Sequence, residues 1–386
     1  PTCAFKDIAL QILPYLLTAS LKKTGEEKTA CILVATSGDT GKAALEGFRD
    51  VDRTKILVFY PKDGVSDIQK LQMVTQEGEN TGVCAVIGNF DDAQTGVKRI
   101  FSDPVLRERL AADGKLLSSA NSINWGRVLP QIVYYISAYC DLLASGAIRM
   151  GEKIDFCVPT GNFGNILAAY YAKRMGLPVG KLICASNSND VLTEFIRTGV
   201  YDRNRPFHAT MSPSMDILIS SNLERLLYLL SGSDEAVRGY MRQLSETGRY
   251  AVTPELHAKI LESFACGCCD EASTAETIGR VFKERSYLID THTAVAWNVL
   301  EQFRRESGSR SMSVVVSTAS AFKFCASVLT ALGVEKQAEG TQILRQLSET
   351  TGWPVPKPLA ALDGKKIRFT KAVQKTEMAD AVMELL

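Results

Sequence analysis

The sequence predicts an α/β protein of two domains, in which parallel or mixed β-sheets are flanked by helices. Short apolar runs alternate with helical patterns, which is typical of βαβ units. The 386 residues exceed the roughly 250 to 300 at which a single hydrophobic core stops growing. With 44 basic and 43 acidic residues the net charge is +1, so a nucleic acid or a membrane surface is not an expected partner. These observations favour a protein that acts on a small molecule.

The expected elements follow one another along the chain. A helix begins the sequence, and its residues Ile8, Ile12 and Leu13 indicate a buried segment. Six strands are each followed by a turn and a helix: residues 31–35, 55–60, 83–87, 154–158, 181–185 and 313–317. The other segments are an amphipathic helix over 127–143, a link over 145–153, a helical region over 200–279 without an identifiable strand, and a proline-rich surface segment over 353–359. Because ligands of α/β sheets bind beyond the carboxyl ends of the strands, the loops there are the candidate binding positions.

The composition also indicates the compartment in which the protein works and argues against a membrane span and a metal site. No apolar run reaches the roughly 20 residues needed to span a bilayer. Ten cysteines are scattered without regular spacing, which favours a reducing compartment and a cytoplasmic location. Cys266, Cys268 and Cys269, with His257 upstream, could form a metal site, but they lack a paired CxxC arrangement. We therefore expect no metal ion.

Lys6, between Phe5 and Asp7 at the beginning of the apolar helix, is the most informative residue. Burial in an apolar pocket lowers the pKa of a lysine, because it disfavours the charged form. The neutral amine can attack a carbonyl, so an aldehyde such as pyridoxal phosphate is the prime candidate partner. The chain also begins without methionine inside this stretch, so we expect a preceding segment.

The loop after the strand at 31–35 is rich in small polar residues. Such residues at the beginning of a helix leave backbone N–H groups free, and the helix dipole favours an anion. A P-loop is excluded, because position 36 is a threonine instead of the first glycine and position 43 is an alanine instead of the magnesium-binding hydroxyl. The candidates for binding a carboxylate or phosphate are Ser37, Gly38, Asp39, Thr40 and Gly41. A helix cap without a ligand remains the alternative.

The loop after the strand at 154–158 contains two glycines three positions apart, together with two asparagines. This composition suits a nest of backbone amides that holds the dianion of a cofactor phosphate. A dinucleotide-binding fingerprint is excluded, because Phe163 stands where the second glycine should be. The candidate residues are Gly161, Asn162, Phe163, Gly164 and Asn165. A tight turn that only requires glycine is the alternative.

A third polar loop precedes the expected helix at 127–143 and contains Asn121, Ser122 and Arg127. Amides, a hydroxyl and the planar guanidinium suit phosphate oxygens, which would imply a phosphorylated substrate beside a phosphorylated cofactor. Alternatively, Asn121 or Ser122 caps the helix and Arg127 is solvated. After the strand at 313–317, Thr318 offers a neutral hydrogen bond to a heteroaromatic nitrogen, or caps the next helix.

Six motifs occur in the order and approximate spacing of threonine synthases, so the sequence resembles this family over nearly its whole length. They are PTCAFKD, ATSGDTG, SANSINWGR, VPTGNFGN, ASNSND and VVVSTASAFKF. The resemblance implies a pyridoxal 5'-phosphate enzyme of fold type II, which is the tryptophan synthase β-like fold. It also implies a large cofactor-binding domain of residues 1–28 and 145–386, a small inserted domain of residues 29–144, and a family N-terminal segment that is absent from this chain.

The resemblance implies roles for residues in five of the six motifs, by position. Lys6 matches the catalytic Schiff base lysine, residues 161–165 match the cup for the cofactor phosphate, and Thr318 matches the hydroxyl on the pyridine nitrogen. Residues 37–41 match the loop that holds the substrate carboxylate and the ring face, and the loop of Asn121, Ser122 and Arg127 matches the substrate phosphate site. No role is carried onto positions 320 and 321, where many relatives have His-Pro. A histidine at position 292 is either an edge of the site or a buried structural residue.

The activity implied is that of a carbon–oxygen lyase acting in threonine biosynthesis. Threonine synthases convert O-phospho-L-homoserine and water to L-threonine and phosphate, by γ-elimination followed by β-addition. A phospholyase of the same family that releases 2-oxobutyrate, a serine/threonine dehydratase-like lyase and a noncatalytic ligand-binding protein remain alternatives. The oligomeric state is left open.

Overall fold

The computed structural model describes residues 1–385, without the side chain of residue 91. The chain forms two compact units: residues 1–130, 322–326 and 336–385 make the first, and residues 131–321 and 327–335 make the second. This division differs from the expected domains, because residues 1–28 belong to the same unit as residues 29–130. Helix α1 (Lys6–Thr24) packs so closely on α2 (Asp39–Phe48) that a side chain at Gly47 would collide with the carbonyl of Leu10.

The first unit is built on a five-stranded parallel sheet in the order β11-β3-β2-β1-β4. Its strands are β1 (Thr29–Ala35), β2 (Thr54–Pro61), β3 (Thr81–Ile87), β4 (Lys115–Ser119) and β11 (Ala372–Gln374). The predicted strands 31–35, 55–60 and 83–87 are confirmed. The chain continues from β1 to β2 on one side, whereas β4 pairs with β1 on the other. The strand order therefore reverses at β1, and such a point is where ligands of α/β sheets bind.

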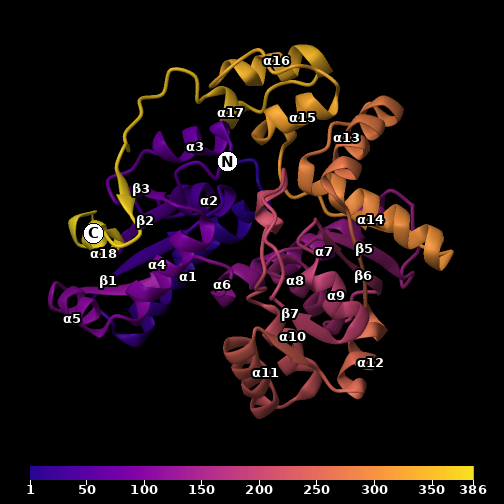
Figure 1. The fold of residues 1–386 in the computed structure, drawn as a ribbon, viewed down its shortest axis with the longest axis horizontal. Helices are drawn as coiled ribbons and strands as arrows, with labels where there is room; N and C mark the ends of the chain where they lie inside the picture. Colours follow the sequence, from indigo (N-terminus) through magenta and orange to yellow (C-terminus); the bar gives the residue numbers. More distant parts are fainter. Residues whose placement is uncertain (386) are drawn as a thin grey trace. The chain divides into compact units, whose positions relative to one another are not determined.

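Helices cover both faces of this sheet. Ile32 and Val34 of β1 face a core formed with α1 and α2, whereas Cys31 and Leu33 face a second core formed with α4, α5 and α18. The yellow C-terminal segment β11 and α18 lies beside β3 (Figure 1). The remaining helices are α3 (Asp67–Val74), α4 (Phe90–Ser102), α5 (Pro104–Ala112), α6 (Trp125–Val128), α16 (Gln342–Thr351), α17 (Lys357–Ala360) and α18 (Met378–Leu385).

The second unit contains a four-stranded parallel sheet in the order β10-β5-β6-β9 and a small antiparallel pair, β7-β8. Its strands are β5 (Ile154–Pro159), β6 (Val179–Ser186), β7 (Val200–Asp202), β8 (Arg249–Ala251), β9 (Phe264–Cys268) and β10 (Ser313–Val315). The chain leaves β5 for β6, and β10 pairs on the opposite side of β5, so the order reverses at β5. The predicted strands at 154–158 and 181–185 are confirmed, and the one at 313–317 ends two residues early.

Helices of the second unit enclose that sheet. Val295 and Val299 of α14 pack on Cys157 of β5 and Ile183 of β6, and Figure 1 shows α14 beside these strands. The helices are α7 (Ile132–Ala144), α8 (Gly164–Arg174), α9 (Val191–Thr198), α10 (Leu223–Ser231), α11 (Asp234–Thr247), α12 (Pro254–Ser263), α13 (Glu271–Arg285) and α14 (Thr291–Ser307). Helix α15 (Cys325–Ala331) begins in the first unit and continues in the second.

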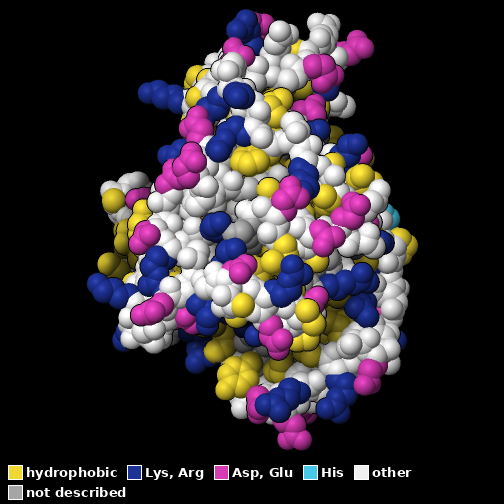
Figure 2. Space-filling model, turned by 90° about the vertical axis from the view of Figure 1, so that its left-hand side faces the viewer, with side chains coloured by type: hydrophobic (Ala, Val, Ile, Leu, Met, Phe, Trp, Pro, Cys, Tyr) yellow, Lys and Arg dark blue, Asp and Glu magenta, His cyan; other side chains and the backbone are white. Residues whose placement is uncertain are grey.

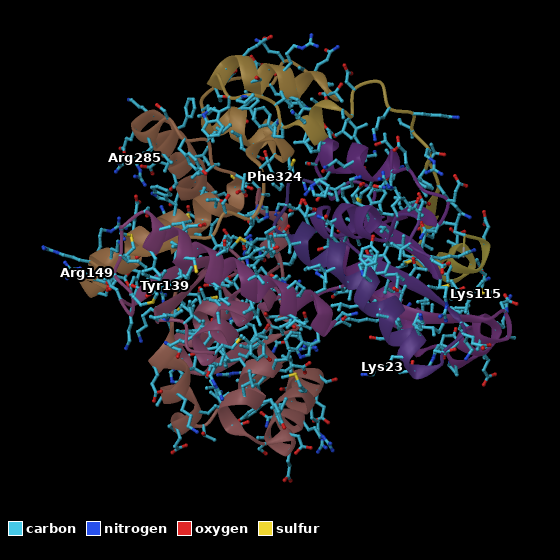
Figure 3. The ribbon with its side chains drawn as sticks, turned by 180° about the vertical axis from the view of Figure 1, so that it is seen from behind. Lys23, Lys115, Tyr139, Arg149, Arg285 and Phe324 are labelled. Carbon is cyan, nitrogen blue, oxygen red and sulfur yellow. The ribbon has the colours of Figure 1, made fainter. Side chains whose placement is uncertain are left out.

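Two sequence-based expectations were wrong in this part of the chain. The region 200–279 holds three strands, β7, β8 and β9, and Cys266 and Cys268 lie in β9. The expected helix 127–143 is interrupted by a 3₁₀-helix, η1 (Leu129–Gln131), because Pro130 has no N–H for the helical ladder. Beyond it, Tyr139 of α7 (Figure 3) donates to the carbonyl of Glu152, which anchors the expected link at 145–153.

The surface carries mixed charge. On the face drawn in Figure 2, acidic and basic side chains are interspersed. Ile8 and Ile12, which we expected to be buried, are exposed on α1. Within residues 1–385 no helix is long and apolar enough to cross a membrane, and no group of three or more metal-binding side chains is suitably placed for a metal ion. All ten cysteines are free thiols.

Candidate active site

Lys6 is the first residue of α1 and is buried, with 9% of its surface exposed, as the sequence predicts. Its ammonium lies 4.4 Å from the centre of the Phe5 ring and 3.7 Å from Oδ2 of Asp39. The positive end of a helix dipole disfavours a cation, and burial acts in the same direction, whereas the carboxylate favours the charged amine. The reactivity of Lys6 therefore depends on two opposing influences: burial and the helix dipole favour its neutral amine, and Asp39 favours its ammonium form.

Asp39 is itself nearly fully buried, with 2% exposed, and it is held by two further side chains. Its Oδ1 accepts a hydrogen bond from Nε2 of Gln69 at 2.9 Å and forms an ion pair with Lys323. Lys323 has no exposed surface, and its backbone carbonyl accepts from Ser66 at 2.7 Å. Lys323 lies within one of the six motifs but has no predicted role there, and Gln69 lies in none of them. Both are distant from Asp39 in the sequence.

The loop after β1 is built around Thr36. Its hydroxyl accepts hydrogen bonds from the N–H groups of Gly38 at 2.9 Å and Gly41 at 2.8 Å, which closes the loop onto the beginning of α2. Gly38 has φ +127° and lies against the Gln69 side chain, so a side chain there would be strained and would collide. The hydroxyls of Ser37 and Thr40 form no hydrogen bond with any described residue, so both can serve a ligand.

The loop after β4 lies beside the loop after β1, because β4 and β1 are neighbours in the sheet. Nδ2 of Asn121 donates to the carbonyl of Ala35 at 2.9 Å, which ties the two strand ends together. Arg127 is buried, with 3% exposed, and donates to the carbonyl of Ala120 at 2.6 Å. The alternative of a solvated Arg127 is therefore excluded. The cap of α6 is Asn124, instead of Asn121 or Ser122. Ser122 is partly buried on the same loop.

In the second unit, the loop after β5 forms a rigid cup at the beginning of α8. Phe163 takes up the left-handed conformation, with φ +62°, and its ring is buried against Phe264. Phe163 therefore contributes its backbone, and not its ring, to the inner surface of the cup. The carbonyl of Asn162 accepts two hydrogen bonds from Asn222, and the carbonyl of Gly161 accepts one from Ser220.

This cup has the chemistry that a phosphate requires. The first turn of α8 has N–H groups without partners in the helix, and the helix dipole is positive there. Asn165 is 8% exposed, and its Oδ1 accepts from Tyr135 at 2.6 Å. Its Nδ2 is buried and has no hydrogen-bond partner among residues 1–385. A buried donor without an acceptor is costly, so an anion at the beginning of α8 would satisfy it.

His292 supports the cup indirectly, through the backbone of Ser214. Its Nδ1 lies 3.0 Å from Asp290, and its Nε2 accepts from the N–H of Ser214 at 3.2 Å. This arrangement requires the neutral ring with the proton on Nδ1. The carbonyl of Ser214 in turn lies against Gly161. Of the two alternatives for His292, the structure therefore supports the buried, hydrogen-bonded one.

The cup predicts a large difference between two glycine substitutions. A Cβ on Gly161 would lie 2.6 Å from the carbonyl oxygen of Ser214 and 3.2 Å from Cα of Met215, so backbone must move. We expect Gly161→Ala to lower stability by roughly 1 to 3 kcal/mol and to weaken cofactor binding about tenfold or more. Gly239→Ala in α11 is the matched control, because a Cβ there meets nothing within 4 Å. It should raise stability by roughly 0.5 to 1 kcal/mol. Thermal unfolding and a titration with pyridoxal phosphate test both; equal behaviour of the two variants would contradict the cup geometry.

Thr318 follows β10, the neighbour of β5 in the sheet, and is buried with 6% exposed. It therefore lies at the same reversal of strand order as the cup, at the carboxyl ends of the strands.

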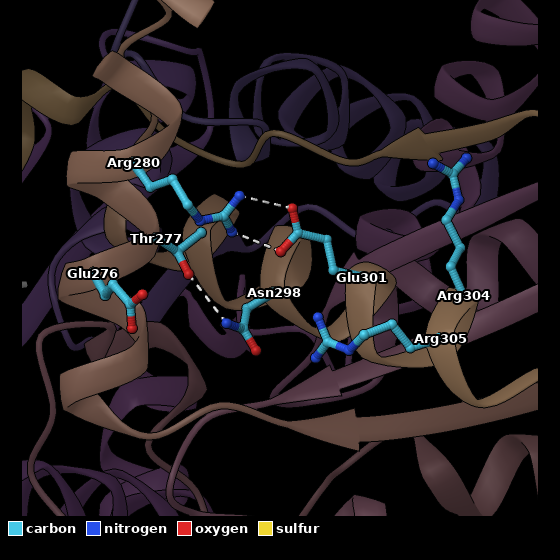
Figure 4. A pocket seen from close by; sticks show the side chains of 7 residues that line it. All are labelled: Glu276, Thr277, Arg280, Asn298, Glu301, Arg304 and Arg305. Atoms are coloured by element: carbon cyan, nitrogen blue, oxygen red, sulfur yellow. Dashed lines mark hydrogen bonds and ion pairs between the residues drawn. The ribbon is translucent and has the colours of Figure 1, made fainter. Parts of the chain in front are cut away.

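A cavity of about 550 Å³ elsewhere in this unit lies between α13 and α14 (Figure 4). Its Arg280 is already paired with both oxygens of Glu301, and Asn298 donates to Thr277. This cavity holds none of the predicted site residues.

Comparisons with known proteins agree with this geometry. Residues 1–263 match the family described as "Pyridoxal-phosphate dependent enzyme". Threonine synthase-like 1 of Macaca fascicularis is 43% identical over 87% of this chain, which spans only 46% of that relative. Threonine synthase of Saccharomyces cerevisiae is 37% identical over 86% of this chain and 67% of the relative.

A solved structure of the PLP-bound threonine synthase from Brucella melitensis is 38% identical to this chain, with a TM-score of 0.83. It covers all of this chain, which spans 76% of it. These findings confirm fold type II and pyridoxal phosphate as the cofactor. The roles of the individual site residues stay predictions. The chain therefore belongs to the threonine synthase family of pyridoxal-phosphate-dependent enzymes.

Proposed function

We propose that the protein is a threonine synthase, which converts O-phospho-L-homoserine and water to L-threonine and phosphate. In this reaction the bond between Cγ and the phosphate oxygen breaks, and water adds a hydroxyl at Cβ. A proton leaves Cα and protons return to the carbon chain, so that no oxidant or reductant is needed. Bound pyridoxal phosphate supplies an electron sink for the charge that develops at Cα.

The residues of this chain have distinct roles in the proposal. Lys6 holds the cofactor in the resting enzyme and, once released as a free amine, accepts the Cα proton and delivers a proton further along the substrate. The cup of residues 161–165 holds the cofactor phosphate. Thr318 donates or accepts a neutral hydrogen bond at the pyridine nitrogen.

The substrate is held by the two loops at the strand reversal of the first unit. Ser37 and Thr40, with backbone N–H groups of α2, bind the substrate carboxylate. Asn121, Ser122 and Arg127 bind the phosphate, because a guanidinium can donate two parallel hydrogen bonds to phosphate oxygens. The observation that carries the proposal is the buried Arg127 beside the loop after β1, because a buried guanidinium there suits a phosphorylated substrate better than one without a phosphate.

The runner-up is a phospholyase of the same family, which would eliminate the same phosphate and release 2-oxobutyrate. It shares every residue role above and differs in whether water adds before the product leaves. A serine/threonine dehydratase-like lyase is less well supported, because its substrates carry no phosphate for Arg127.

One assay separates these functions. The protein is incubated with pyridoxal phosphate and O-phospho-L-homoserine, and phosphate, threonine and 2-oxobutyrate are measured together. Equal amounts of phosphate and threonine are the expected result. Phosphate with 2-oxobutyrate would establish the phospholyase. No phosphate release, together with turnover of serine or threonine in a parallel incubation with these amino acids, would establish the dehydratase.

A further inference from the structure

Asp39 connects two buried lysines of the first unit. Lys323 pairs with Oδ1 of its carboxylate, and Lys6 lies 3.7 Å from Oδ2. Gln69 donates to Oδ1 as well, at 2.9 Å, and is fixed by the capping box that begins α3. The carboxylate is therefore oriented by groups on two other segments, and Lys6 approaches its other oxygen, Oδ2.

This arrangement answers an electrostatic difficulty. A carboxylate alone beside Lys6 would hold it as an ammonium, which cannot attack an aldehyde. A carboxylate in a loop that binds the substrate carboxylate would also repel its ligand. The buried ammonium of Lys323 pairs with the same carboxylate and offsets its negative charge. Asp39 therefore attracts the ammonium of Lys6 less strongly and repels a ligand carboxylate less strongly.

We propose that Lys323 is a positioning residue for Lys6: it holds Asp39 by one oxygen, so that Lys6 shares that carboxylate instead of forming an exclusive ion pair with it. The inference rests on the proposed role of Lys6 as the cofactor-binding lysine. It adds a residue, on a segment far along the chain, that controls how readily the reactive amine loses its proton.

The other charged groups near this cluster are already engaged. Asp7 accepts hydrogen bonds from the N–H of Thr2, at 2.9 Å, and from the hydroxyl of Thr2. Burial raises the pKa of the Cys3 thiol, despite the opposing charge of Lys323. Cys3 therefore stays neutral at physiological pH. Lys6, Asp39 and Lys323 are the groups whose charges decide the balance.

The test measures how the reactivity of Lys6 depends on pH. The full chain without cofactor is labelled with acetic anhydride at a series of pH values, and acetylation of Lys6 is quantified by mass spectrometry. This readout needs neither cofactor nor activity, so it is independent of whether the proposed function is right. We expect Lys323→Met to raise the midpoint of Lys6 labelling by about one pH unit or more, because Asp39 then pairs with Lys6 alone. Lys323→Arg, which keeps the charge, should stay within about half a unit of the natural protein.

A double-mutant comparison distinguishes the shared carboxylate from direct repulsion between the two lysines. Asp39→Asn should lower the midpoint, because the favourable carboxylate is gone. In the Asp39→Asn background, Lys323→Met should shift the midpoint by less than half of its effect in the natural protein. An unchanged midpoint in Lys323→Met, or an equal shift in both backgrounds, would overturn the proposal. Should Lys323→Met not fold, Asp39→Asn decides alone: a midpoint that does not fall would overturn it.

In the holoenzyme, the absorbance of bound pyridoxal phosphate gives a second readout. Its pH titration should move in Lys323→Met and stay close to that of the natural protein in Lys323→Arg. A merely structural role of Lys323 would lower the unfolding temperature of both variants and leave the titration in place.

Discussion

Lys6→Ala should abolish turnover of O-phospho-L-homoserine, with a loss of at least about 10³-fold in kcat, because it removes both the covalent hold on the cofactor and the proton acceptor. Phosphate release measures the loss. Borohydride reduction of the holoenzyme, followed by peptide mass spectrometry, should place the cofactor on Lys6 in the natural protein and nowhere in the variant.

The structure indicates that this variant will fold. Alanine is a better helix former than lysine at the beginning of α1, and Asp39 keeps its partners Lys323 and Gln69 when Lys6 is lost. Lys23→Ala is the matched control, because Lys23 is exposed in the last turn of the same helix (Figure 3). It should leave kcat unchanged. A Lys6→Ala protein that keeps a tenth of the activity, or still carries reducible cofactor on another lysine, would refute the assignment of Lys6.

The strands could be predicted where they are buried on both faces. In β1 and β2 nearly every residue is buried, so the sequence shows continuous apolar runs. Strand β9 escaped prediction because Phe264–Cys268 is short, contains Gly267 and is only partly buried at its other three positions apart from Phe264. The helix expected over 127–143 is interrupted for a local reason, the proline at position 130. The prediction gave more weight to the amphipathic pattern around this proline than to the proline itself.

The site was predictable to the extent that it consists of loops after strands. Small residues at 37–41 and 161–165 mark close backbone approach and helix beginnings, and these signals are local. The side chains that orient the loops are not local: Ser66 meets the carbonyl of Lys323 across 257 positions of sequence, and Asn222 meets Asn162 across 60. A single sequence contains no signal for such pairs. Family motifs contained Lys323, but only the structure shows that its ammonium lies on Asp39.

Burial of the first helix also could not be read from composition. Ile8 and Ile12 are as apolar as Leu10 and Leu13, yet the first two are exposed and the last two are in the core. The position of each residue around the helix decides whether its side chain faces α2. Because α1 has apolar residues on both faces, its sequence does not show the helical periodicity that would distinguish the buried face.

Arg127→Lys should lower kcat/KM for O-phospho-L-homoserine by about 10²-fold, which corresponds to roughly 2.7 kcal/mol. Lysine keeps the positive charge but loses the planar pair of donors, so the loss should come from the geometry of phosphate binding. The effect should be specific to the phosphate. Inhibition by inorganic phosphate should weaken in parallel, whereas the affinity for pyridoxal phosphate should not change.

Arg127 also donates to the carbonyl of Ala120, and losing that bond inside the protein costs roughly 1 to 3 kcal/mol of stability. Thermal unfolding therefore has to be measured beside the kinetics, at temperatures where the variant is fully folded. Arg109→Lys on the exposed side of α5 is the matched control and should change neither quantity. A folded Arg127→Lys protein with unchanged kcat/KM and unchanged phosphate inhibition would show that Arg127 only supports the loop after β4. The substrate phosphate would then have to be bound elsewhere, and the choice of O-phospho-L-homoserine over an unphosphorylated substrate would lose its main physical argument.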